Sequence, residues 1–312
     1  MRLLLFVLLA AGAACSAPSD VPTPAPPPAA PAAPAAPAAP SAPAEPPAPP
    51  VPAPQVTSVP PAAPPPVVEP VANGVIPAGT TQLLTVVTPR WTATDGELRR
   101  WARADGGWRA VGDPVPVVVG RSGLGWGIGL HGDAAGARRS GIAGAGEPGK
   151  AEGDGRAPAG AFRLASAFGY AGAEPSGLPY RESTPTSVCI DDAASPRYNT
   201  VFDAGRDPAS LGVSLERMRR DDALYRLGVI VDHNGGGALG TAPVAGAGSC
   251  IFLHVWRGPG TSTAGCTAMP DARLAAVMAW LEADAAPALV QLPAEAYARL
   301  RTTWALPDAS GG

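Results

Sequence analysis

The chain has 312 residues, of which 40 are proline, and its formal net charge at pH 7 is -3. Lysine is scarce and arginine carries most of the positive charge, so the composition offers no strongly basic surface, and we expect no nucleic-acid partner. After the first residues, no apolar run approaches the roughly 18 to 20 residues that a membrane-spanning helix needs.

Residues 1–15 are typical of an export signal, which predicts a periplasmic protein. A positive start, Met1-Arg2, precedes the apolar stretch Leu3 to Ala10 and a zone of small residues that ends at Cys15. The position of Cys15 indicates a lipoprotein signal, in which this cysteine is acylated and tethers the protein to a membrane. Gly12 stands where such signals usually have a larger aliphatic residue, so ordinary cleavage after an Ala-x-Ala site is the alternative.

Residues 16–72 are predicted to form a disordered segment rich in proline and alanine. Such a composition has too little large apolar surface to offset chain entropy, and its prolines favour extended polyproline II. About 50 residues at about 3.1 Å each could reach on the order of 150 Å from an anchor. The alternative is a passive low-complexity tail.

Residues 73–306 are predicted to form the catalytic domain, followed by a flexible tail, 307–312. Short apolar runs separated by glycine, proline and acidic clusters predict strands in a mainly antiparallel or mixed sheet. The expected strands are Gln82–Thr88, Pro116–Val119, Ala161–Leu164, Leu227–Val231 and Cys250–Trp256. Apolar residues at helical spacing predict helices over Leu211–Tyr225 and Asp271–Glu282, the second capped by Asp271. The expected fold class is mainly β with minor helices.

The chemistry is concentrated between Gly248 and Pro270. His254 ends an apolar strand, and Cys266 follows a glycine-rich loop. A cysteine is mostly a neutral thiol near pH 7, so a nucleophilic cysteine needs a nearby base or cation, and histidine can serve as both. Gly265 leaves space for an acyl group, and backbone N–H groups around Cys266 could face an oxyanion. The alternative is a buried structural thiol and a core histidine.

This segment resembles the signature of the YkuD-type L,D-transpeptidases, in which a histidine precedes a Ser/Thr-x-Gly-Cys element. The similarity spans about residues 80 to 295 and includes several further motifs in the expected order: Glu152–Gly160, Ala167–Tyr170, Cys189–Asp192, Tyr198-Asn199, Val231–Asn234 and Ile251–Trp256. The resemblance implies a β-sandwich domain with Cys266 as nucleophile, His254 as base, and Thr263 and Gly265 in a supporting loop.

The resemblance also implies acyl transfer from peptidoglycan stem peptides. Cys266 would form a thioester with a stem tetrapeptide, and an amine would resolve it into a 3-3 cross-link or anchor a protein, while water would give a carboxypeptidase. A noncatalytic peptidoglycan-binding module is a further hypothesis. Ala264 and Ala268 replace polar residues of the commoner family signature, and the spacing from His254 to Cys266 is shorter, so the resemblance specifies the nucleophile more closely than the substrate.

Several other residues are candidates with structural alternatives. His233 and Asn234 are candidate substrate contacts or turn residues, and Arg156 could bind a stem-peptide carboxylate or be a solvated loop residue. In an oxidising compartment, Cys189 and Cys250 could form a disulfide and leave Cys266 free. No close pair of metal ligands is present, so we expect neither a metal nor a cofactor, and we expect a monomer.

Overall fold

The computed structural model of the chain describes residues 74–235 and 241–309. The predicted signal segment with Cys15, the Pro/Ala-rich segment 16–72 and the last three residues of the predicted tail therefore lie outside the described residues. Within the described part of the chain, no helix is both long enough and apolar enough to cross a membrane.

Eight strands pair side by side until the last meets the first. The β1–β14 and β12–β13 pairs are parallel and the other pairs of the ring are antiparallel. In order around the ring, the strands are β1 (Gln82–Thr88), β14 (Ala288–Pro293), β6 (Ala157–Gly169), β11 (Leu227–Val231), β12 (Phe252–Val255), β13 (Thr267–Met269), β4 (Val115–Val118) and β2 (Asp95–Ala104).

The closed barrel corrects one part of the expected fold. The chain is mainly β with few helices, as predicted, but the predicted β-sandwich is wrong. The ring closes through β2, whose residues pair with β4 at Asp95–Leu98 and with β1 at Glu97–Ala102. The edges of β1 and β4 are thereby both covered, which is how barrels avoid the open edges that sandwiches leave.

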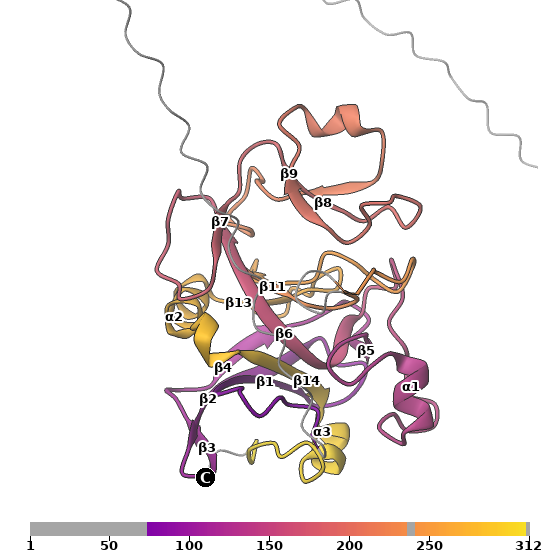
Figure 1. Cartoon of the computed structure of the whole chain (residues 1–312), viewed down its shortest axis with the longest axis vertical. Helices are drawn as coiled ribbons and strands as arrows, with labels where there is room; N and C mark the ends of the chain where they lie inside the picture. The colour runs from indigo at the N-terminus through magenta and orange to yellow at the C-terminus, as the bar shows by residue number, and fades with distance from the viewer. Residues whose placement is uncertain (1–73, 236–240, 310–312) are drawn as a thin grey trace, which may run out of the picture. The chain divides into compact units, whose positions relative to one another are not determined.

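Three short strands pair with strands of the barrel, and three more form a separate sheet. Strand β3 (Gly107–Ala110) extends β2, while β5 (Leu124–Trp126) and β7 (Tyr180–Glu182) pair with the two ends of β6. A separate three-stranded sheet has the order β10-β8-β9 and lies beyond the β7 end of the barrel in Figure 1. Its strands are β8 (Ser187–Ile190), β9 (Val201–Asp203) and β10 (Leu215–Arg217).

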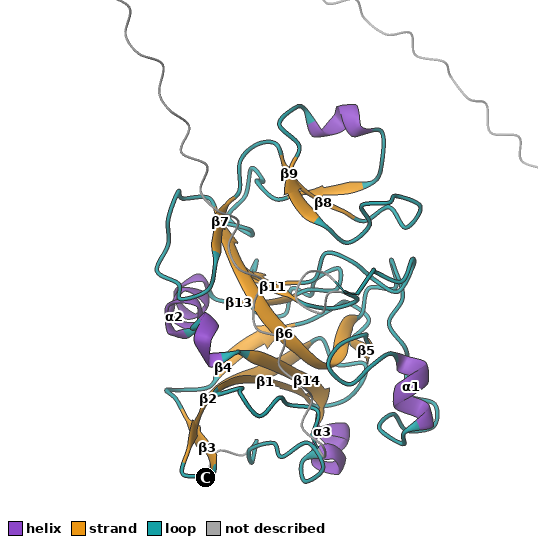
Figure 2. Cartoon of the chain, in the orientation of Figure 1, coloured by secondary structure: helices purple, strands orange, loops and turns teal. Residues whose placement is uncertain are grey.

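The helices are short and lie outside the strands (Figure 2). They are α1 (Ala134–Arg139), α2 (Asp271–Trp280) and α3 (Ala294–Leu300), with 3-10 turns at Pro208–Leu211 and Ala283–Ala285. Helix α2 buries Leu274, Val277 and Met278 and contacts β11 and β12. Burying such aliphatic side chains contributes about 1.5 to 3 kcal/mol each, so α2 braces the strand that carries His254.

The structure confirms the five predicted strands, two with the predicted bounds and three with shifted ends, and overturns one predicted helix. Residues 211–225 contain the end of a 3-10 turn, strand β10 and turns instead of a helix. Gly212 has a left-handed backbone, which stops the 3-10 turn, and β10 pairs with β8. Helix α2 forms close to its predicted position, but Pro270 rather than Asp271 is its N-cap.

Candidate functional site

The parallel pairing of β12 with β13 brings His254 and Cys266 together. His254 is the register partner of Ala268, and Cys266 lies two residues before Ala268. Because alternate residues along a strand point to the same face, the imidazole and the thiol share one side of these strands. The backbone N–H of Phe252, two residues before His254, donates to Cys266 Sγ at 3.4 Å.

One cavity of about 840 Å³ contains both side chains in its wall. Such a volume lies within the range of small-molecule and peptide side-chain sites. Ala268 is fully buried in this wall, so the position at which the family signature has a polar side chain is apolar here. Other side chains that line the cavity are Lys150, Glu152, Glu216, Arg220 and Tyr225.

Cys266 is a neutral thiol in this arrangement. It is the only free cysteine among the described residues, is 8% exposed, and its Sγ donates to the Cys250 carbonyl oxygen at 3.4 Å. Burial raises the pKa of the Cys266 thiol to about 12, and the Glu216 carboxylate acts in the same direction. The Phe252 N–H, Lys150 and the Tyr225 hydroxyl lower this pKa. A thiolate therefore forms only when a proton acceptor takes part.

His254 is held as a neutral base. Its Nδ1 lies 2.7 Å from the Val255 carbonyl oxygen, which can only accept, so this contact assigns the proton to Nδ1 and the lone pair to Nε2. Burial lowers the pKa of His254 to about 4, so the ring is uncharged near pH 7. The ring meets that of Tyr225 edge-on, with centroids 5.2 Å apart. Packing thus fixes the orientation of the imidazole.

Thr263 holds the loop that presents Cys266. Its hydroxyl donates to the Cys266 carbonyl oxygen at 2.6 Å and accepts the Gly265 N–H at 3.1 Å. The Gly265 N–H is therefore engaged, and of the N–H groups expected to face an oxyanion, that of Cys266 is the better candidate. A Cβ on Gly265 would lie 3.0 Å from the Arg156 carbonyl oxygen. Glycine at this position thus allows a close approach to backbone.

His233 and Asn234 are buried in the protein interior, and neither belongs to the cavity wall within the described residues. The His233 Nδ1 accepts the Ile128 N–H at 3.2 Å, and burial lowers the pKa of His233 to about 3. The Asn234 amide donates to the carbonyl oxygens of Val244 and Gly248, both at 2.9 Å. Both side chains hold the segment that leads to β12.

Arg156 also has structural partners. Its Nη1 donates to the carbonyl oxygens of Ser122 and Leu124, at 2.8 and 2.9 Å, and the side chain is absent from the cavity wall of the described chain. Arg121, by contrast, lines the cavity. Arg156 therefore stabilises the surrounding backbone. Arg121 is the arginine of this region that a substrate carboxylate could reach.

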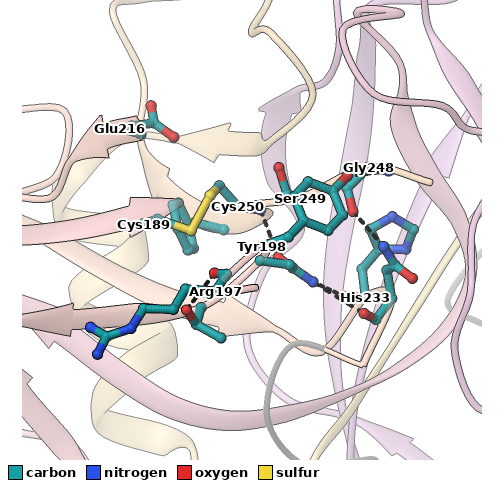
Figure 3. Close-up of a disulfide and its surroundings, with 12 residues drawn as sticks. Cys189, Arg197, Tyr198, Glu216, His233, Gly248, Ser249 and Cys250 are labelled. Atoms are coloured by element: carbon teal, nitrogen blue, oxygen red, sulfur yellow. Dashed lines mark hydrogen bonds between the residues drawn. A yellow bond between two sulfur atoms is a disulfide. The ribbon is translucent and has the colours of Figure 1, made fainter. Parts of the chain in front are cut away.

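The structure joins Cys189 of β8 to Cys250 in a disulfide (Figure 3). Near this bridge, the Asn199 side-chain oxygen accepts the Cys250 N–H at 2.9 Å. Tyr198 donates a hydrogen bond to Glu152. The disulfide and the Asn199 contact fasten the three-stranded sheet to the segment that precedes His254, and the Cys250 carbonyl oxygen of that segment contacts Cys266 Sγ.

Two side chains of the site, Glu216 and Tyr225, were missed by sequence reasoning. The Tyr225 hydroxyl donates to Glu216 at 2.5 Å, and both residues line the cavity. Both fall within the segment that was predicted to be a helix, in which Glu216 would belong to a solvated charged face. Gly212, a poor helix former near the start of that segment, was the available signal against a helix.

No three His, Cys, Asp or Glu side chains of the described residues are grouped so that they could hold a metal ion. Compared with protein-family models, with curated proteins and with solved structures, the chain matches none of them. The resemblance to the YkuD-type L,D-transpeptidases therefore stays a prediction from the sequence motifs.

Proposed function

We propose that the protein is a cell-wall acyltransferase of the L,D-transpeptidase type, exported to the periplasm, with Cys266 as its nucleophile. The observation that carries the proposal is the placement of His254 and Cys266 on one face of the β12–β13 pair, in the wall of one cavity. The closed barrel differs from the sandwich that the family resemblance implied, so the proposal depends on the site and on the motifs rather than on the fold.

The proposed reaction begins with proton transfer. His254 Nε2 accepts the proton of Cys266, whose sulfur attacks the carbonyl carbon before the terminal D-Ala of a stem tetrapeptide. The departing D-Ala amine takes the proton back from His254, and a thioester remains on Cys266. An acceptor amine then attacks the thioester, loses a proton to His254 and releases the thiol.

The charge around the cavity supports a peptide with several carboxylates as the donor. Arg121, Arg217, Arg220 and Arg257 line the cavity together with Lys150. Lys150 is 3% exposed at its side chain and is paired with Asp154 at 2.7 Å. Arg121 is exposed, and Arg257 is 62% exposed and lies 3.9 Å from the Asp222 carboxylate. Arginine binds carboxylates through paired N–H groups, so the rim suits the carboxylates of stem peptides.

The first test is acylation by a carbapenem, a β-lactam that opens on a reactive thiol. The purified protein is incubated with the drug and weighed intact, next to Cys266→Ala and to His254→Gln, which keeps a polar side chain. We expect one adduct on the wild type, none on Cys266→Ala, and slower formation on His254→Gln. An adduct that persists in Cys266→Ala, or no adduct on the wild type, would count against the proposal and favour a noncatalytic wall-binding module.

The second test identifies the acyl acceptor. The protein is incubated with purified disaccharide tetrapeptides, and the products are separated by mass. Cross-linked dimers that lack one D-Ala support the transpeptidase, while tripeptide monomers alone would replace it with a carboxypeptidase that uses water. Cys266→Ala is the matched control, because it removes the sulfur and leaves the barrel strands unchanged.

A further inference from the structure

A partly buried carboxylate and a buried phenol lie beside the candidate nucleophile and have no part in the mechanism above. Glu216 is held in β10 as the register partner of Cys189, and Cys189 is bonded to Cys250. The Cys250 carbonyl oxygen in turn contacts Cys266 Sγ. This chain of contacts fixes Glu216 next to the sulfur, and Figure 3 shows its position near the disulfide.

Tyr225 links the carboxylate to the sulfur. It is 4% exposed, and its ring packs edge-on against Phe168, Phe252 and His254. Its hydroxyl donates to Glu216 Oε1 at 2.5 Å. Tyr225 and Cys266 belong to one packed cluster with Phe252, and both residues line the cavity. The Tyr225 hydroxyl is also among the groups that lower the pKa of the Cys266 thiol.

We propose that Glu216 is a second proton acceptor for Cys266 and that it acts through the hydroxyl of Tyr225. The S–H bond breaks and its proton passes to the phenol oxygen, while the phenol proton passes to Glu216 Oε1. One proton thus moves from sulfur to carboxylate, and no electrons are exchanged with another reactant. The phenol then donates a hydrogen bond to the thiolate, which stabilises it.

Charge conservation favours this route in a buried site. Transfer of the proton to His254 creates a thiolate and an imidazolium, which are two new charges on side chains that are 8% and 6% exposed. Transfer to Glu216 moves one negative charge from the carboxylate to the sulfur and creates none. Because a low-dielectric environment penalises each new charge, the second route has the smaller desolvation cost. His254 then stays neutral.

The surrounding charges affect both ends of the route. Desolvation raises the pKa of the Glu216 carboxyl, so it holds a proton more readily than an exposed glutamate. Arg220 opposes this shift, and Asp191 and Glu152 reinforce it. At the other end, Lys150 favours the thiolate and ionised Glu216 disfavours it. Protonation of Glu216 removes that repulsion at the moment when the thiolate forms.

The inference rests on Cys266 being the nucleophile of the proposed function, and its test needs no peptidoglycan. The full chain is alkylated with iodoacetamide from pH 6 to 10 without reductant, and the rate is read by mass on the peptide that contains Cys266. The variants are Glu216→Gln, Tyr225→Phe and their combination. Tyr198→Phe is the matched control, because Tyr198 also donates to a carboxylate, that of Glu152.

We expect Glu216→Gln and Tyr225→Phe each to slow alkylation at pH 7 by about tenfold or more, as loss of a general base does, and the double variant to be no slower than either. Tyr198→Phe should alkylate at the wild-type rate. If Glu216 acted only as a fixed negative charge that disfavours the thiolate, its removal would make alkylation of Glu216→Gln faster. That result would overturn the proposal. An unchanged rate would overturn it as well. Thermal unfolding of each variant verifies that it is folded.

The two proposals fail in distinguishable ways. Slower alkylation of the Glu216 and Tyr225 variants, together with no product from stem peptides, would reject the transpeptidase and keep the proton route. Products from stem peptides, together with unaltered alkylation, would keep the transpeptidase and leave His254 as its base.

Discussion

The disulfide between Cys189 and Cys250 is expected to contribute a large part of the stability of the described unit. The two cysteines are separated by 61 positions, and the enclosed chain includes β9, β10 and β11. The chain-entropy relation for a loop of this length predicts that the bridge raises the free energy of unfolding by about 4 kcal/mol. Without the disulfide, β8 and β10 would be held together mainly by their ladder, which has only three register pairs.

The perturbation is Cys189→Ser with Cys250→Ser in a Cys266→Ser background, so that no free thiol of this region can form a new bridge. Cys266→Ser alone is the reference. We expect urea denaturation, followed by tryptophan fluorescence, to show a free energy of unfolding lower by about 3 to 4 kcal/mol. At about 2 to 4 °C per kcal/mol, the melting temperature should fall by roughly 6 to 16 °C.

Reduction of the reference protein with dithiothreitol should reproduce the loss seen in the double serine variant. A loss below about 1 kcal/mol in both experiments would refute the reasoning. It would mean that positions 189 and 250 stay close together in the unfolded chain even without the bridge, or that the other contacts of the three-stranded sheet stabilise it without the disulfide.

Three further predictions concern the loop, the core and pH. Thr263→Val should lower the free energy of unfolding by about 1 to 3 kcal/mol, because it removes both hydrogen bonds of the hydroxyl. Thr263→Ser keeps a hydroxyl and should keep the wild-type stability. Equal losses in the two variants would show that these hydrogen bonds do not stabilise the loop. Gly228→Ala would place a Cβ 2.2 Å from the Phe168 ring and should cost about 1 to 3 kcal/mol by calorimetry, with recovery in a double variant with Phe168→Leu. Burial lowers the pKa of His131 from 6.5 to about 4. As the pH falls below 6.5, this histidine therefore takes up a proton in the unfolded chain before it does so in the folded protein. The stability that is complete above pH 6.5 is lost as the pH falls toward 4. At pH 5 this loss is about 2 kcal/mol, and His131→Asn should remove it from the pH dependence of unfolding; an unchanged pH dependence would show that the histidine is not involved.

The strands could be predicted because their composition is unambiguous. Leu227–Val231 and Gln82–Thr88 are runs of β-branched and aliphatic residues between turn signals, and both form strands with the predicted bounds. The closure of the barrel could not be predicted in the same way. It depends on β2, whose sequence DGELRRWARA is mostly polar and buries only Leu98 and Trp101.

The error over residues 211–225 has a physical reason. Leu211, Leu215 and Met218 have helical spacing, but Met218 is buried with Cys189, Cys250 and Cys266 in a cluster formed by distant segments. A long-range disulfide and a strand ladder outweigh local helix propensity here, and neither is encoded in the spacing of apolar residues. That segment contributes Glu216 and Tyr225, so the same error hid part of the candidate site.

The parallel ladder between β12 and β13 has a consequence for the loop that joins the two strands. The ladder pairs His254 with Ala268, two positions after Cys266, and the crossover at residues 257–262 contributes no residue to that pairing. Changes in the length or side chains of this crossover should therefore leave the pairing in place while they alter the cavity wall, to which Arg257, Thr261 and Ser262 belong.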